Sequence, residues 1–183
     1  KGRVRTKKLI IATNGYSSED VPDWMAGRYL PALSAILVTR ELTAEEIAAQ
    51  GWSSDFMAYD TRNLLHYFRL MPNRRFLFGG RGGVSSSAGA LADRRKILRA
   101  DFERMFPAWS QVETPHFWSG FVCLTRDLTP FAGPVPGMDN VWAGFAWHGN
   151  GVALGTWSGK LLAGLATGTR AAPALMSPPP RRF

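Results

Sequence analysis

Short apolar runs separated by turn-forming residues dominate the pattern of this chain, which is typical of β-strands joined by tight connections. Turn-type residues at 61–63 and 72–74 separate three of these runs and predict an antiparallel meander of hairpins. The glycines at 79–83, continued by the serines at 85–87, predict a flexible break after the meander. The runs with strand character are 9–12, 29–40, 56–60, 64–71, 75–80, 115–124 and 140–146.

Two stretches follow helical spacing instead. Thr43 and Glu46 have the spacing of a capping box, so we expect a short helix over 44–50. Residues 91–105 place apolar side chains at helical spacing on a charged background. This predicts a surface helix that ends before Pro107.

A glycine-rich segment follows the last predicted strand and opens a third helix. Gly151, Gly155, Gly159 and Ala163 recur every four residues, so a helix stacks them along one side. Glycine costs about 1 kcal/mol relative to alanine inside a helix, which indicates that something approaches this backbone closely. An electron-rich cofactor at the helix N-terminus and tight packing of the helix on a sheet both explain the spacing.

This order of elements predicts an α+β fold. The strand at 9–12 and the strand–turn–helix at 140–168 form one α/β layer, and the antiparallel sheet with its covering helix is inserted between them. The first strand is expected to lie in a parallel sheet and to be buried on both faces.

Composition and charge narrow the class of protein. The 183 residues carry a formal net charge of +8, but the basic residues are scattered, without zinc-finger spacing or an RNA-binding signature. We therefore expect no nucleic-acid partner. Cys123 is the one cysteine, which indicates an inert buried thiol and a reducing, cytoplasmic location. No apolar run reaches the length of a membrane span, and the three histidines have no metal-site spacing.

The two ends of the chain predict that it is part of a longer protein. It begins without methionine on a basic stretch that leads directly into a strand, and it ends in a proline-rich tail. A face normally covered by the remainder is expected to be apolar, which makes a homo-oligomer possible.

Three motifs in this order resemble the FAD-dependent amine and amino-acid oxidases of the D-amino-acid oxidase superfamily, with greatest likeness to the gamma-glutamylputrescine oxidase type. Residues 9–16 (Leu-Ile-Ile-Ala-Thr-Asn-Gly-Tyr) resemble a late strand of the flavin domain, which ends in Ala-Thr-Gly or Ala-Thr-Asn-Gly. Residues 118–133 resemble the strand and loop that return to the flavin. His148–Val152 (His-Gly-Asn-Gly-Val) resembles the glycine turn beside the flavin ring.

The resemblance implies a two-domain flavoenzyme in which the flavin domain is interrupted by a substrate domain. A hydride would pass from the substrate to the flavin, the resulting imine would hydrolyse, and oxygen would reoxidise the flavin. The implied cofactor-binding residues are Thr13, Asn14, Gly15, His148, Gly149, Asn150, Gly151 and Val152; no catalytic residue and no metal are assigned. The implied segments are 1–28 and 119–169 for the FAD domain, 29–118 for the substrate domain and 170–183 for the tail.

Two departures from the family pattern shape the expected activity. The Gly-x-Gly-x-x-Gly pyrophosphate loop is absent, so we expect this chain to need the N-terminal half of the same protein and to bind FAD weakly alone. Where members that oxidise amino acids place a carboxylate-binding arginine, this chain has Val122. That favours an amine, either polyamine-like or a gamma-glutamyl amine, over an α-amino acid.

The candidate substrate residues are Tyr59, Tyr67, Arg69 and Trp147, with Arg81 and Trp118 as further possibilities. Tyr67 and Arg69 are two apart and so share one face of a strand. Core packing of the aromatic residues and a surface role for the arginines are the simpler alternatives. His148 either bonds the flavin or packs the turn, and Asp127 is expected to structure its own turn.

Two other functions remain open at this point. A catalytically silent interaction domain could keep the oxidase fold, and a flavin dehydrogenase could pass electrons to a partner, with an amino acid as its substrate. A yellow full-length protein would distinguish an enzyme from the silent scaffold.

Overall fold

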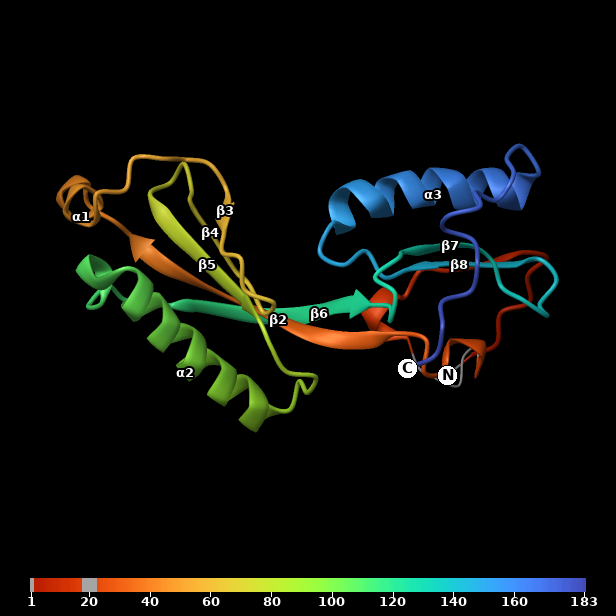
Figure 1. Ribbon diagram of the computed structural model, residues 1–183, viewed down its shortest axis with the longest axis horizontal. Coiled ribbons are helices and arrows are strands. Elements are labelled where there is room, and N and C mark those ends of the chain that lie inside the picture. The colour runs from red at the N-terminus through yellow and green to blue at the C-terminus, as the bar shows by residue number, and fades with distance from the viewer. Residues whose placement is uncertain (1, 18–22) are drawn as a thin grey trace. The chain divides into compact units, whose positions relative to one another are not determined.

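The computed structural model describes residues 2–17 and 23–183, and the chain divides into two compact units (Figure 1). Unit 1 comprises Lys1–Ala32 and Phe121–Phe183, and unit 2 comprises Leu33–Gly120. The segment predicted as the inserted domain is 29–118. No helix in the described part of the chain has both the length and the apolar character to cross a membrane.

Unit 1 is built on a three-stranded sheet with the order β1-β8-β7. β1 (Leu9–Ile11) runs parallel to β8 (Val141–Phe145), and β8 runs antiparallel to β7 (Phe131–Pro134). The helix α3 (Gly151–Thr167) covers one face of this sheet (Figure 1). The first and last segments of the chain therefore form one α/β layer, as predicted, whereas β7 was not anticipated.

The core of unit 1 lies between the sheet and the loops beside it. Its buried residues are Ile11, Met25, Tyr29, Cys123, Phe131, Val135, Ala143, Phe145 and Ala146. The prediction that β1 is buried on both faces is wrong for the described chain: Leu9 is 46% exposed and Ile10 is 41% exposed. The reason is that β1 is an edge strand of this sheet and only Ile11 reaches the core.

The proline-rich tail packs against unit 1. The amide of Ala132 in β7 donates to the carbonyl of Met176 at 2.8 Å, and Arg28 donates to the carbonyl of Pro180 at 2.6 Å. Gly133 leaves room for Ser177, because a Cβ at Gly133 would lie 3.1 Å from that side chain. The tail thus lies along the outer edge of β7.

Unit 2 is built on a sheet with the order β3-β4-β5-β2-β6. The predicted meander is confirmed, since β3 (Ala58–Tyr59), β4 (His66–Leu70) and β5 (Arg75–Arg81) pair antiparallel in sequence. β5 also pairs antiparallel with the long β2 (Leu30–Glu41), and β6 (His116–Leu124) follows beyond β2.

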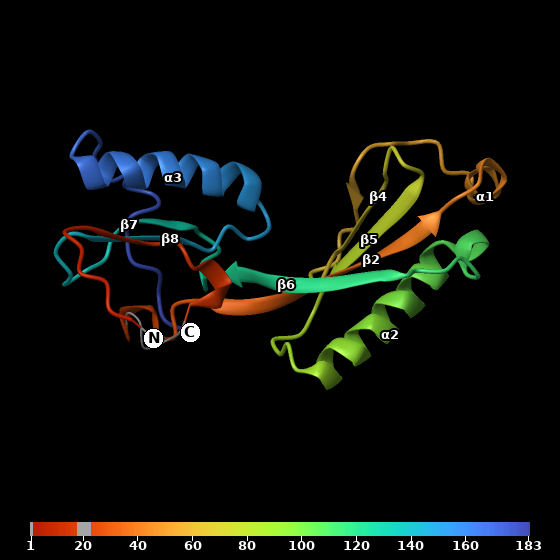
Figure 2. The ribbon, with the colours of Figure 1, turned by 180° about the vertical axis from the view of Figure 1, so that it is seen from behind.

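The helix α2 (Ala88–Met105) covers one face of this sheet (Figures 1 and 2). It begins three residues before the predicted helix, because the Ser87 hydroxyl caps it by accepting from the amide of Ala90. The helix buries Leu98 and Phe102 against an aromatic core that also includes Phe76, Phe78, Phe106 and Trp109. Edge-to-face contacts such as Phe76–Phe106, 4.7 Å between ring centroids, add to the burial.

The glycine stretch at 79–83 is not the flexible break that the sequence predicts at its start. Gly79, Gly80 and Arg81 belong to β5, and both glycines are buried. The glycines make room for neighbours: a Cβ at Gly79 would lie 2.2 Å from the Tyr67 ring, and one at Gly80 would lie 2.7 Å from the Arg94 guanidinium. Close approach, and not flexibility, accounts for glycine here.

A buried histidine joins the meander to α2. His66 is 3% exposed, with Nδ1 2.8 Å from Asp60 Oδ2 and Nε2 3.0 Å from Asp101 Oδ2. Burial of the Asp60 carboxyl opposes a fall in its pKa, but hydrogen bonds from the His66 ring and from the amides of His66 and Arg62 outweigh it and lower the pKa. These two carboxylates satisfy both ring nitrogens.

The capping box predicted at Thr43 is formed, and α1 spans Ala44–Gln50 as expected. The Glu46 carboxylate accepts from Arg40 and from the amide of Thr43, and these hydrogen bonds lower the pKa of Glu46 to about 2. Because the folded-state pKa is depressed, the carboxylate stabilises the fold above its unfolded pKa near 4.5, and this contribution is lost as the pH falls toward 2.

We therefore expect Glu46→Gln to lower the free energy of unfolding at pH 7 by about 0.5–1 kcal/mol, because glutamine can still accept from the Thr43 amide but loses the partly exposed ion pair with Arg40. The difference from wild type should shrink between pH 4.5 and pH 2. Urea denaturation at a series of pH values measures it. Asp93→Asn, which changes a carboxylate whose side chain is 74% exposed, is the control, and a difference independent of pH would contradict the assignment.

Candidate functional site

Two groups of the implied cofactor-binding residues meet at one edge of the unit 1 sheet. Thr13–Gly15 follow β1 and His148–Val152 follow β8; because these strands are parallel neighbours, their carboxyl ends lie side by side. The Asn14 side chain joins the two loops, since its Oδ1 accepts from the amide of Ala146 at 3.0 Å. Ala146 is fully buried, so this hydrogen bond satisfies a donor that water does not reach.

The backbone at this edge takes several left-handed conformations. Asn14, Ala146 and His148 have φ angles of 47°, 66° and 52°, and Gly149 has 98°. Asparagine tolerates the left-handed region because its short side chain bonds locally, whereas alanine and histidine do so at a cost. These conformations bring the chain tightly from β8 into α3, and strained turns of this kind are concentrated at functional sites.

His148 is oriented by a neighbouring threonine. The hydroxyl of Thr125 donates to the carbonyl of Thr129 at 2.8 Å, so it can only accept from the imidazole, whose Nε2 lies 3.3 Å away. This contact assigns the proton to Nε2 of His148. Thr125 is 1% exposed, and its role was missed from the sequence because it depends on how the 125–129 turn lies against His148. Asp127 belongs to that turn.

The N-terminus of α3 is uncovered in the described part of the chain. Gly151 is exposed, Val152 is 91% exposed, and no side chain caps the helix at Asn150. The first amides of a helix have no partner within it, and they favour an electron-rich group.

The glycine stripe of α3 lies along one side of the helix, next to Trp147 at Gly151 and Gly155. A Cβ added at Gly159 would have no neighbouring atom within 4 Å, and the buried residues of the helix are instead Ser158, Leu161, Leu162 and Gly164. The tight contact between the helix and the sheet is made at Gly144 of β8, which is not part of the stripe: a Cβ there would lie 2.8 Å from Leu162 of α3. A concave pocket of about 320 Å³ lies beside the stripe, lined in part by Ile10, Ser158 and Gly159.

Trp147 supports this region from inside unit 1. Its indole would lie 3.7 Å from a Cβ added at Gly151 or Gly155 and 3.3 Å from one added at Gly144. The ring therefore packs between β8 and the first turns of α3. The other three implied substrate residues belong to unit 2.

Tyr59, Tyr67 and Arg69 share one face of the unit 2 sheet. Tyr59 pairs directly with Tyr67, and Arg69 is two residues further along β4. Phe68 points to the opposite side, into the core beneath α2, so the three side chains lie on the side away from α2. Tyr59 is 71% exposed.

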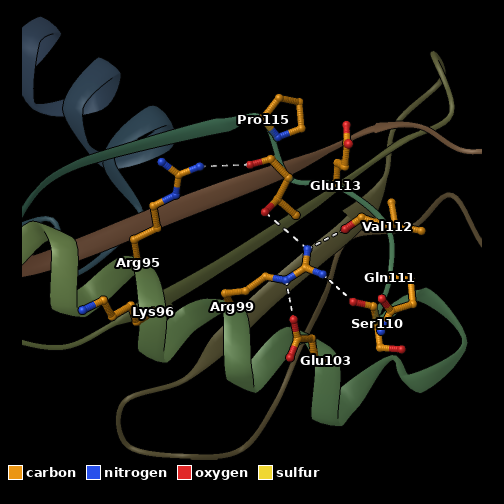
Figure 3. A pocket seen from close by; sticks show the side chains of 10 residues that line it. Arg95, Lys96, Arg99, Glu103, Ser110, Gln111, Val112, Glu113 and Pro115 are labelled. Carbon is orange, nitrogen blue, oxygen red and sulfur yellow. Dashed lines mark hydrogen bonds and ion pairs between the residues drawn. The ribbon is translucent and has the colours of Figure 1, made fainter.

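A shallow pocket of about 620 Å³ beside α2 is lined by Arg99, whose contacts hold the fold together at this point (Figure 3). Arg99 donates to the carbonyls of Val112 and Ser110 at 2.6 and 2.5 Å and pairs with Glu103 at 2.7 Å. Its guanidinium thus connects the segment before β6 to the helix.

The single cysteine has the character expected of it. Burial raises the pKa of the Cys123 thiol to about 12, which keeps the thiol protonated and unreactive.

The family model for FAD dependent oxidoreductase (DAO) matches residues 1–165. The chain belongs to this family. The family's cofactor is FAD. The family match confirms the resemblance that was inferred from the three motifs. The two sheets with their covering helices confirm the predicted α+β fold class.

Curated relatives cover the same range. The chain is 29% identical over 168 residues to gamma-glutamylputrescine oxidoreductase of Escherichia coli and 34% identical over 173 residues to the probable oxidoreductase OrdL of Rhizobium meliloti. These matches cover 92% and 91% of the chain but only 38% and 37% of the relatives, so the chain spans less than two fifths of their length.

Solved structures share the fold. Glycine oxidase from Bacillus cereus matches with a TM-score of 0.72 at 16% identity, over 95% of this chain and 46% of that one. Iminodiacetate oxidase from Chelativorans sp. matches with a TM-score of 0.73 at 20% identity, over 97% and 47%. At these identities the likeness concerns the fold of the DAO oxidases.

The residues at the edge of unit 1 fit a flavin. The uncapped amides at the start of α3 offer donors, and Gly149 and Gly151 present no side chain that would keep a flat ring away from the backbone. His148 adds an oriented imidazole. Which of these residues touch the cofactor stays a prediction.

Removing the Asn14 acceptor should destabilise the site measurably. We expect Asn14→Ala to lower the free energy of unfolding by about 1–3 kcal/mol, because the buried Ala146 amide loses its oxygen acceptor and keeps only the weaker sulfur acceptor of Cys123. Chemical denaturation followed by circular dichroism measures the loss. Asn14→Asp keeps an acceptor and should stay near wild type, whereas Asn14→Gly tolerates the φ of 47° but has no acceptor. Wild-type stability of Asn14→Gly would contradict the role of this hydrogen bond.

Proposed function

We propose that this chain is the flavin-facing and substrate-binding part of an FAD-dependent oxidoreductase that oxidises the C–N bond of an amine. The observation that carries the proposal is the link from Asn14 to Ala146, which joins the two loops that resemble the family's flavin motifs. Family membership over residues 1–165 supports it.

FAD, when bound, supplies the hydride acceptor for this reaction. The chain's own contribution is to orient and to stabilise charge. The free amides at the start of α3 and the positive end of its dipole favour electron density on a group beside Gly149–Val152. His148, with its Nε2 proton directed to Thr125, presents a ring of fixed orientation to the same turn.

The substrate in this proposal is an amine, polyamine-like or a gamma-glutamyl amine. Val122 occupies the position at which amino-acid-oxidising members carry an arginine, which argues against a carboxylate on the reacting carbon. The resemblance to gamma-glutamylputrescine oxidoreductase is consistent with this class. Tyr59, Tyr67 and Arg69 are the proposed substrate contacts on unit 2, and Trp147 is the one on unit 1.

We also propose that the rest of the FAD domain, including the pyrophosphate loop, comes from another part of the same protein and completes unit 1 at β1. β1 is an edge strand with exposed apolar residues, and the adjoining pocket contains a buried Ser158 hydroxyl that has no hydrogen-bond partner among residues 2–17 and 23–183. An added strand and helix would cover these groups. The free thiol of Cys123 is consistent with a cytoplasmic location. The exposed apolar residues of β1 are also consistent with a homo-oligomer, which remains part of the proposal.

An absorbance spectrum of the full-length protein, followed by anaerobic titration, tests the proposed function. We expect a flavin band that bleaches with amines. Bleaching with α-amino acids alone would keep the enzyme but overturn the substrate class. A protein without a flavin band after reconstitution with FAD would favour the silent scaffold.

A single methyl group tests the flavin-facing turn. Gly151→Ala meets only an ordinary 3.7 Å contact with Trp147, so the fold should accept it, while a flavin against this backbone would be displaced. In the full-length protein we expect Gly151→Ala to weaken FAD affinity, measured by equilibrium dialysis, with unchanged thermal stability of the apoprotein. Gly89→Ala, the same change in the exposed first turn of α2, is the matched control. Equal affinities of the two variants would contradict the placement of the flavin.

A further inference from the structure

The proline-rich tail, residues 170–183, binds β7 through both polar backbone groups of one residue. The amide of Ala132 donates to the carbonyl of Met176 at 2.8 Å, and the carbonyl of Ala132 accepts from the Ser177 hydroxyl at 3.2 Å. The approach is close, since a Cβ added at Gly133 would lie 3.1–3.2 Å from atoms of Ser177 that include its Cα. The tail lies beyond residues 1–165, which the family model matches, so the family pattern does not account for these contacts.

The end of the tail is held by a second segment of unit 1. Arg28 donates to the carbonyls of Trp24 and Pro180 at 2.8 and 2.6 Å, and its guanidinium lies 5.3 Å from the centroid of the Trp24 ring. The amide of Phe183 donates to the carbonyl of Gly27 at 2.8 Å. Pro180 is buried. The tail is therefore an integral part of the unit 1 fold.

The tail also contacts the 125–129 turn. Arg126 donates to the carbonyl of Arg182 at 3.1 Å, and a hollow of about 240 Å³ is lined by Asp127 of the turn and Leu175 of the tail. Leu128 in this turn has a φ angle of 56°, in the left-handed region that is unfavourable for leucine. Such a conformation persists only where the surrounding contacts hold it, and the tail supplies some of these contacts.

The same turn orients His148. The buried Thr125 hydroxyl donates to the carbonyl of Thr129 and lies 3.3 Å from Nε2 of the imidazole. Thr129 is two residues before Phe131, the first residue of β7, so the strand that binds the tail also places the carbonyl that fixes Thr125. Consecutive contacts thus lead from the tail through β7 and the turn to the imidazole.

We infer that the proline-rich tail is a positioning element of the candidate flavin site. By binding Ala132 and Arg126 it fixes the 125–129 turn, and through Thr125 it fixes the His148 ring. The effect on FAD rests on the proposed function, because it requires a flavin beside His148. The link between the tail and the turn is a property of the protein without its cofactor.

Hydrogen exchange of the full-length apoprotein, followed by mass spectrometry, tests this link without flavin. Gly133→Val suits a strand but displaces Ser177, and Arg126→Gln removes a donor to the tail. Losing a hydrogen bond shifts a local opening equilibrium by a factor of about 2–10, so residues 125–129 and 146–150 should exchange faster by that factor in both variants. Arg181→Gln, which removes the same charge from an exposed residue of the tail, is the matched control and should exchange at the wild-type rate.

Faster exchange confined to the tail itself, or equal exchange in Arg126→Gln and Arg181→Gln, would overturn the inference. A double-mutant cycle then tests the route through Thr125. Thr125→Val replaces the hydroxyl by a methyl group and should weaken FAD affinity by a factor of about 2–10, as should Gly133→Val. The double variant should bind FAD no more weakly than Thr125→Val alone.

The cycle separates positioning from general destabilisation. Effects of Gly133→Val and Thr125→Val that multiply, or an unchanged FAD affinity in Gly133→Val, would overturn the role of the tail at the flavin site. If the full-length protein binds no FAD at all, the proposed function fails, and the exchange measurement alone decides whether the tail holds the turn.

Discussion

The hydrogen bond from the buried Ala146 amide to the Asn14 side chain holds the candidate flavin site together. It joins two loops that are more than 120 residues apart in sequence, and it does so where the backbone is bent into left-handed conformations on both sides. Parallel pairing of β1 with β8 brings the loops close, but it ends at Ile11 and Ala143, before the turn that follows β8. The asparagine joins that turn to the loop after β1, because a buried amide without an acceptor would be costly.

Glycines serve two different purposes in the two units. In unit 1, Gly149 and Gly151 leave the backbone bare at the start of α3, where a cofactor can approach. In unit 2, Gly79 and Gly80 are buried in β5 and receive the Tyr67 ring on one face and Arg94 on the other. The first use keeps a surface open to a ligand, and the second gives a side chain a defined position on a sheet.

Local patterns predicted much of the fold. The Thr43–Glu46 pair located the start of α1, since a capping box depends only on residues three apart. The hairpin turns located β3, β4 and β5 for the same reason. β7 was missed because its four residues, Phe131–Pro134, include a glycine and a proline and derive their strand conformation from pairing with β8. The break expected at 79–83 was wrong for residues 79–81 because the need for glycine there arises from Tyr67 and Arg94, which lie elsewhere in the sequence.

The same distinction applies to the site. The motif residues of unit 1 were identifiable from sequence because they are contiguous in two short segments. Thr125, Ser34 and Gly79 were not, because their contacts with His148 and Tyr67 exist only after the turn and the sheet register are set. That Tyr67 and Arg69 share a face followed from their spacing, but that Tyr59 lies on the same face required the pairing of β3 with β4.

A crystal structure of the full-length protein with FAD bound would test the central claim most directly. We expect the flavin ring to lie against the backbone of Gly149–Val152, with the Asn14–Ala146 hydrogen bond intact beneath it. A flavin bound elsewhere, with the start of α3 covered by protein, would contradict the account.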